Sequence, residues 1–198
     1  NIPVRINCVV THQNKNAIPW LLKYAKESIT PVTFNLPSDF PSGAKDLEKE
    51  VMLNDEEVRE FYSHLLEYKQ NDKKISSLIL ASDEIINQTL AYPVPYKEII
   101  WRTADDQMNS NNTCLFGQIW VHINSNGDIY PCSQLWNTPD KFQPKNVRKD
   151  GLDSALENAR NLKCKSCFCL APAEWKRTMT PKGMLKGARV TIAQSLGI

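Results

Sequence analysis

The residues best suited to chemistry in this chain are cysteines, and five of them fall in its second half. They follow the spacing C-x17-C and, further on, C-x2-C-x-C: Cys114, Cys132, Cys164, Cys167 and Cys169. Thiolates of a C-x2-C pair can bind one metal centre together. Taken alone, the spacing suits an iron–sulfur centre and a zinc centre about equally, and a disulfide framework is a weaker third alternative.

The composition favours a metal centre over disulfides. A chain of 198 residues can bury a core and does not need disulfides to fold. No apolar run reaches the roughly 20 residues of a membrane-spanning helix, and we find no secretory signal. We therefore expect a cytoplasmic protein without a membrane partner, in a compartment where clustered cysteines bind metal more often than they pair. The net charge of +2 gives no support for a nucleic-acid partner.

A β-hairpin is expected to carry the first two of these cysteines near its open end. Aliphatic residues at 119, 121 and 123 alternate with Trp120, His122 and Asn124, as in a half-buried strand. Asn126-Gly127 is typical of a tight hairpin turn, and residues 128–132 return as the second strand. A short amphipathic helix over 152–162 then leads to Cys164. Only one C-x2-C pair is present, whereas a zinc ribbon has two.

The first hundred residues predict part of a larger α/β fold. A strand over 2–10, a helix starting at 14–16 and a strand over 31–36 form a βαβ unit with parallel strands. Two parallel strands bury too little surface to stand alone, so we expect them to end a larger sheet or barrel. Further helices are predicted over 54–69 and 75–90. We place the domain boundary at residue 100.

Three polar residues follow the predicted parallel strands and are candidates to contact a cofactor or substrate. His12 and Asn14 come after the first strand, and Asn35 lies at the end of the second. Active sites of α/β barrels lie at the C-terminal ends of the strands. The simpler alternative, which we favour, is that the polar run around His12 only caps the following helix.

These motifs together resemble the radical S-adenosylmethionine enzymes. The spacing C-x12-G-x4-C followed by a distant C-x2-C is similar to the auxiliary-cluster domain that follows the barrel in many members, called SPASM or, in its short form, twitch. The segment WVHINSNGDIYPC, residues 120–132, resembles the hairpin of that domain. IPVRINCVVT, residues 2–11, followed by Asn14, resembles the fifth barrel strand and its turn.

The resemblance implies a fold and a cofactor. The fold is α/β: the last βα units of a partial (β/α)6 barrel over 1–100, followed by a small α+β twitch-like domain with a hairpin and a helix over 101–198. The cofactor is one auxiliary [4Fe–4S] cluster, with Cys169 as an alternative to the ligands that the resemblance implies: Cys114, Cys132, Cys164 and Cys167. In the family such clusters transfer electrons during radical-based oxidation or modification of a small molecule or peptide. The resemblance also implies an electron donor such as flavodoxin or ferredoxin.

The chain departs from the family in one important respect. The radical-generating C-x3-C-x2-C motif is absent from these residues. We therefore expect this chain to be the C-terminal part of a longer enzyme, whose other part binds S-adenosylmethionine and a second [4Fe–4S] cluster. The residues carry no prediction for the catalytic groups. The alternative from another class is a non-enzymatic zinc-binding structural or interaction module.

Overall fold

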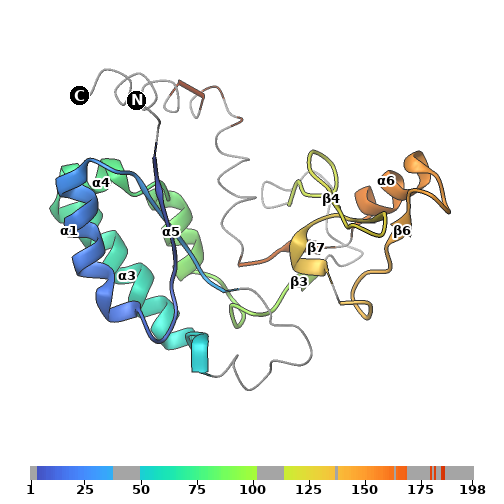
Figure 1. Cartoon of the computed structure of the whole chain (residues 1–198). Coiled ribbons are helices and arrows are strands. Elements are labelled where there is room, and N and C mark those ends of the chain that lie inside the picture. The colour runs from blue at the N-terminus through green and yellow to red at the C-terminus, as the bar shows by residue number, and fades with distance from the viewer. Residues whose placement is uncertain are drawn as a thin grey trace. The chain divides into compact units, whose positions relative to one another are not determined.

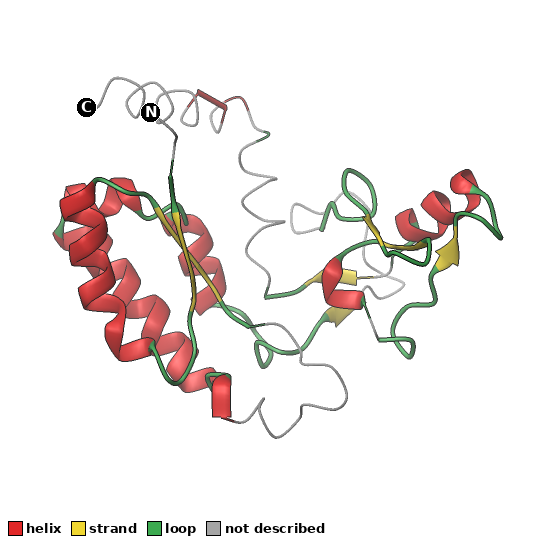
Figure 2. Ribbon diagram, in the orientation of Figure 1, coloured by secondary structure: helices red, strands yellow, loops and turns green. Residues whose placement is uncertain are grey.

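The chain divides into two compact units, Asn1–Glu98 and Ile99–Ile198. The computed structural model describes residues 4–37, 50–101, 114–136, 138–162 and 164–168, together with positions 179, 181, 184 and 185. The sequence placed the boundary at residue 100. Figure 1 traces the chain, and Figure 2 shows that helices dominate the first unit and that short strands and loops dominate the second.

The first unit opens with strand, helix and strand, in the order predicted from the sequence. Its described elements are β1 (Ile6–Val9), the 3-10 helix η1 (Lys15–Ala17), α1 (Ile18–Ser28), β2 (Val32–Asn35), α3 (Asp55–Asn71), α4 (Lys73–Leu78) and α5 (Asp83–Leu90).

Strands β1 and β2 and helix α1 form the predicted βαβ unit. The two strands pair in parallel, with Ile6 opposite Val32 and Cys8 opposite Phe34. The side chains of Val32 and Phe34 are buried in the core of the unit, where the Phe34 ring meets the edge of Phe61 of α3 at a centroid distance of 5.5 Å. The apolar face of α1 closes this core with Ile18, Leu22 and Ala25.

Helix α3 begins where the sequence predicts, at a capping box. The Asn54 side chain accepts a hydrogen bond from the backbone N–H of Glu57, and the Glu57 carboxylate accepts one from the backbone N–H of Asn54. These two bonds satisfy N–H groups that a helix start leaves without partners. The helix buries Val58, Phe61 and Leu65, and the Phe61 ring contacts Phe34 of β2.

The prediction of a single helix over 75–90 is wrong, because the chain folds here into α4 and α5 with an extended link. Ile79 is extended, at φ −77° and ψ 114°, and bridges Val32 in parallel. The next residue, Leu80, donates its backbone N–H to the Val32 carbonyl at 3.0 Å. Ser82 then caps α5 by accepting from the N–H of Ile85. A third segment therefore continues the parallel order of β1 and β2.

The second unit is built around short strands and one helix. Its described elements are β3 (Ile100–Trp101), β4 (His122–Ile123), β5 (Asp128–Tyr130), the 3-10 helix η2 (Ser133–Leu135), β6 (Lys145–Asn146), α6 (Leu152–Arg160) and β7 (Cys164–Ser166).

The predicted hairpin is present as β4 and β5. The two strands are antiparallel, with Ile123 opposite Ile129, and Gly127 takes a φ of +92° in the turn, a conformation that glycine adopts without strain. The first arm is shorter than predicted, and its alternation does not bury Ile119 or Ile123, which are 45% and 54% exposed. A second turn, in which Gly117 has a φ of +86°, precedes the first arm, and Phe116 bridges Trp120 across it.

Strand β6 and helix α6 complete the hairpin into a small core. β6 pairs with β5, so the sheet order is β4-β5-β6. Ile129, Ala155 and Ala159 form one buried cluster, which joins β5 to α6. Asn146 of β6 is buried, and its side-chain amide donates to the Asn126 carbonyl at 3.0 Å. This bond holds the hairpin turn against β6.

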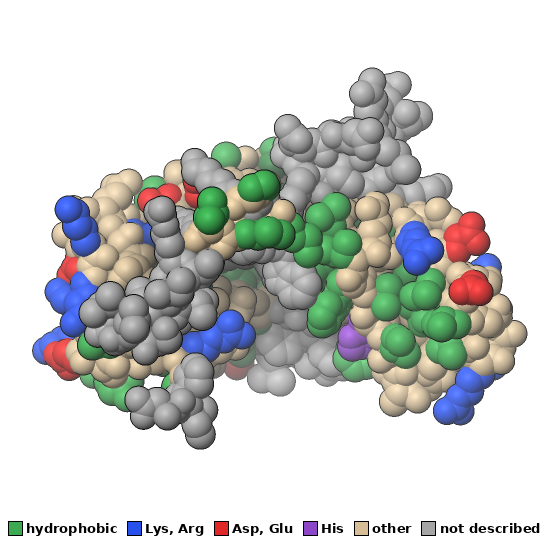
Figure 3. All heavy atoms as spheres, turned by 90° about the horizontal axis from the view of Figure 1, so that it is seen from above, with side chains coloured by type: hydrophobic (Ala, Val, Ile, Leu, Met, Phe, Trp, Pro, Cys, Tyr) green, Lys and Arg blue, Asp and Glu red, His purple; other side chains and the backbone are tan. Residues whose placement is uncertain are grey.

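Large hydrophobic side chains also reach the surface, as Figure 3 shows in green for one face of the molecule. In the described residues between 99 and 148, several large hydrophobic side chains are more than a third exposed. They are Trp101, Ile119, Trp120, Ile123 and Trp136. None of the helices in the described part of the chain combines the length and the apolar character that crossing a membrane would need.

Candidate functional site

Two of the predicted cysteine ligands lie together in the core of the second unit. Cys132 lies two residues after the end of β5 and immediately before η2, while Cys164 opens β7. Their exposed fractions are 8% and 5%, and both belong to one buried cluster with Leu135 and Leu162. The fold thus brings together a cysteine of the hairpin and a cysteine of the C-x2-C pair, which lie far apart in the sequence.

The other two predicted ligands adjoin the same region through the backbone. Cys114 donates its backbone N–H to the carbonyl of Lys165 at 3.1 Å, so the segment that leads into the hairpin runs beside β7. Cys167 follows β7 and is half-buried, as is Cys114. Three partly buried hydrophobic residues pack against the Cys132–Cys164 cluster: Ile99, Phe116 and Phe142.

The donor set fits an iron–sulfur or zinc centre in chemistry, but the thiols do not form a closed ligand group. Soft thiolates from several backbone segments, shielded by apolar neighbours, suit either centre. No disulfide joins the five described cysteines. Within the described ranges, no three His, Cys, Asp or Glu side chains are arranged to hold a metal ion. Cys169, the predicted alternative ligand, lies outside the described residues.

In the first unit, His12 is part of an ionic cluster after strand β1. Its Nδ1 lies 2.9 Å from Oε1 of Glu57, and Nζ of Lys15 lies 2.6 Å from the same oxygen. The backbone N–H of His12 donates to the carbonyl of Val51 at 2.9 Å. The Glu57 side chain is 13% exposed, whereas that of His12 is 56% exposed. The imidazole is thus oriented by a largely buried carboxylate while much of its ring faces solvent.

The hydrogen bonds at Glu57 stabilise its charged form. The Lys15 ammonium contributes most, and the Asn54 backbone N–H adds to it, so that together they hold the pKa of the Glu57 carboxyl below its usual range. A negatively charged group at this position also favours the first turn of α3, where the helix dipole is positive.

The other two predicted residues after the strands make local bonds instead. Asn14 accepts from the backbone N–H of Thr11 and donates to the carbonyl of Val9, each at 2.8 Å. It holds the N-cap position of η1 but makes no side-chain cap there. Asn35 donates to the side chain of Asn7 at 2.6 Å. Of the three, only His12 contacts a charged group from another element, so the favoured capping interpretation does not account for it.

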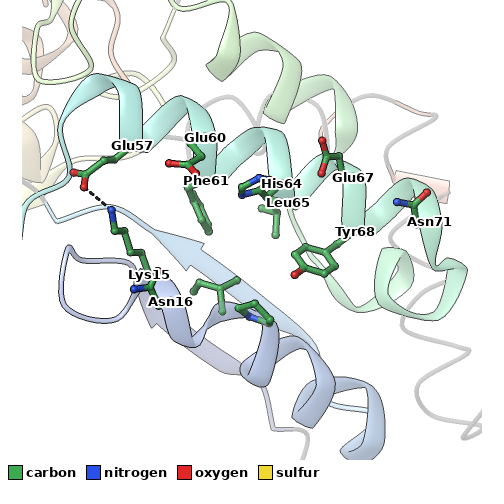
Figure 4. A pocket seen from close by; sticks show the side chains of 12 residues that line it. Lys15, Asn16, Glu57, Glu60, Phe61, His64, Leu65, Glu67, Tyr68 and Asn71 are labelled. Atoms are coloured by element: carbon green, nitrogen blue, oxygen red, sulfur yellow. Dashed lines mark hydrogen bonds and ion pairs between the residues drawn. The ribbon is translucent and has the colours of Figure 1, made fainter.

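A pocket of about 470 Å³ lies next to this cluster, between η1, the start of α1 and one face of α3. Figure 4 shows Lys15 and Glu57 at one end of it, where they form an ion pair. Phe61 and His64 are among the other lining residues. Sequence reasoning missed Glu57 as a partner of His12. The Asn54-x-x-Glu57 capping pattern could have marked it, but only as part of a helix start.

No protein-family model matches the chain, and neither the curated proteins nor the solved structures include a significant match to it.

Proposed function

We propose that this chain is the C-terminal part of a radical S-adenosylmethionine enzyme and that its second unit holds an auxiliary [4Fe–4S] cluster. The observation that carries the proposal is the shared burial of Cys132 and Cys164. The Cys114 backbone bond to Lys165 supports it by joining a third cysteine-bearing segment to the same place. Cys167 would supply the fourth thiolate.

The residues around these thiols would bind and shield the cluster. A [4Fe–4S] cluster supplies one-electron transfer when bound. Ile99, Phe116 and Phe142 pack against the cysteine cluster and would exclude water from it, which lowers the local dielectric and tunes the reduction potential. The substrate class is a small molecule or peptide, an electron donor such as flavodoxin or ferredoxin is the partner, and the cytoplasm is the proposed location.

The first unit supports the barrel part of the proposal. Its strands β1 and β2 are parallel, and Ile79 extends the parallel order by bridging Val32. An α/β barrel repeats one unit, in which a helix connects each strand to the next parallel strand. S-adenosylmethionine and the radical-forming cluster would bind in the part of the enzyme that carries the C-x3-C-x2-C motif.

Anaerobic reconstitution of the full chain with iron and sulfide tests the cluster. We expect a broad visible absorption and about four irons per chain. Cys132→Ser and Cys164→Ser should each lose most of the absorption and iron, because each removes a buried ligand. Cys8→Ser is the matched control, since Cys8 lies in β1 of the first unit, and it should load as the unaltered protein does.

Two results would contradict the proposal. A colourless protein that binds one zinc ion through the same cysteines would favour the zinc module instead. Equal loss of iron from the Cys8 variant and from the Cys132 and Cys164 variants would mean that the iron is bound without a specific site.

A further inference from the structure

A second pocket lies in the second unit, beside the buried cysteines. Its volume is about 520 Å³, and its lining residues include Phe142 and Leu162. Leu162 belongs to the cluster of Cys132 and Cys164, and Phe142 packs against it. Trp101, which also lines the pocket, stands opposite Cys164 in the pairing of β3 with β7. A ligand in this pocket would therefore lie next to the proposed cluster site.

The walls of this pocket offer an aromatic surface and hydrogen-bond acceptors. Trp101 is 36% exposed. The side-chain N–H groups of two lining amides are already bound: Asn158 donates to the Gln143 carbonyl at 2.9 Å, and Gln143 donates to the Pro139 carbonyl at 2.6 Å. No hydrogen bond from the described residues reaches the side-chain oxygen of either amide. Both oxygens are thus available as acceptors.

The charges around the pocket favour a cation on balance. Asp140 lines it, and Asn158 and Asn161 belong to the last turn and C-cap of α6, where the helix dipole is negative. Lys141 also lines the pocket, and Asp140 and Lys141 are both exposed. Their charges offset each other, so the end of α6 decides the balance. A planar cation with several N–H donors matches an aromatic face, a carboxylate and amide oxygens together.

We propose that this pocket binds a guanidinium group, as in the arginine side chain of a peptide. The guanidinium would stack on Trp101 and donate to Asp140 and to the amide oxygens of Gln143 and Asn158. Two parts of this inference rest on the proposed function: the choice of a peptide among the proposed substrates, and its position beside the cluster. Recognition of the guanidinium itself needs no metal.

Titration of the full, metal-free chain with N-acetyl-arginine amide tests the pocket, with the indole N–H signal of Trp101 as the NMR readout. We expect this signal to shift with arginine and to shift much less with the citrulline analogue, which is planar and neutral, or with the lysine analogue, which is not planar. Trp101→Ala should weaken binding by about fivefold or more, as measured by calorimetry, and Trp101→Phe by less, because phenylalanine keeps an aromatic face. Asp140→Asn should also weaken it, whereas Lys141→Gln should strengthen it.

Trp136→Ala is the matched control, because Trp136 is an exposed tryptophan of the same unit that does not line the pocket. It should leave arginine binding unchanged. Equal binding of the citrulline analogue, or stronger binding with Asp140→Asn, would overturn the proposal. So would equal losses in Trp101→Ala and Trp136→Ala. The titration contains no iron. A failure to bind arginine would therefore leave the proposed cluster untouched, and a failed reconstitution would leave the arginine-binding result intact.

Discussion

At the scale of single residues, Glu57 shows how one side chain can join a helix start to a loop. One carboxylate oxygen completes the capping box at Asn54, and the other accepts from Lys15 and lies beside His12. Each contact alone is a small contribution. Together they hold the loop after β1 against the start of α3 and fix the direction of the His12 ring.

The charge of Glu57 should make the stability of the first unit depend on pH. Its pKa is lowered in the folded protein, so its stabilising charge is fully present above the pKa of an unfolded glutamate, about 4.3. That contribution is lost as the pH falls through the lower folded pKa. Glu57→Gln keeps the capping pattern but removes the charge, so its deficit in unfolding free energy should be present at neutral pH and vanish in acid.

Glu57→Ala separates the cap from the charge. It should retain a deficit of about 0.5–1 kcal/mol even in acid, because the bond to Asn54 is lost at every pH. Glu60→Gln, one turn further along α3 and exposed, is the control and should stay within about 0.5 kcal/mol of the unaltered protein. Urea unfolding at several pH values measures all three. A Glu57→Gln deficit that does not change with pH would contradict this account.

At the scale of elements, the second unit depends on how closely its turns approach α6. A Cβ added at Gly117 would lie 2.3 Å from the carbonyl oxygen of Ala159, an atom of the helix backbone that cannot rotate away. The turn before the hairpin is therefore packed directly on α6. This contact lies beside Phe116, which packs against the cysteine cluster.

Gly117→Ala should destabilise the second unit more than Gly127→Ala. The two glycines have similar positive φ values, +86° and +92°, so both variants should lose about 1–2 kcal/mol to backbone strain. At Gly127 the nearest atoms belong to the Asn146 side chain at 3.4 Å, which is an ordinary van der Waals distance. Gly117→Ala should lose about 1–3 kcal/mol more from overpacking. Urea unfolding compares the two, and equal losses would mean that the turn is not pressed against α6.

At the scale of the whole molecule, each unit has a core of its own, and only the second carries the predicted ligands. A ligand stabilises the part of a protein that binds it. The tryptophans allow the second unit to be followed separately, because Trp20 is the only one in Asn1–Glu98; the others are Trp101, Trp120, Trp136 and Trp175.

Cluster loading should therefore raise the stability of the second unit selectively. In a Trp20→Phe background, the urea midpoint of tryptophan fluorescence should rise on anaerobic reconstitution and fall again when iron is removed. Hydrogen exchange at the amides of β1 and β2 should stay the same in both states. If loading instead slowed exchange at β1 and β2 as much as in the second unit, the two units would unfold as one cooperative body.

Short-range patterns in the sequence were enough to predict several of the helices and strands. Asn54 or Asp55 marks the start of α3, Asn126-Gly127 marks the hairpin, and apolar spacing identifies α1 and α6. These signals are local, because a cap or a turn involves residues only a few positions apart. The cysteine spacing likewise predicted which residues could share a centre, but it left iron–sulfur and zinc open.

What the tertiary structure decided depends on contacts between distant segments. The extended link at Ile79 arises because its backbone pairs with Val32, and helical periodicity alone does not reveal that partner. The shared burial of Cys132 and Cys164 and the pairing of His12 with Glu57 likewise require the chain to return to the same place. By itself the sequence determined residue types and local conformation. Only the packed chain determined which side chains meet, because burial and hydrogen bonding between remote segments depend on the whole fold.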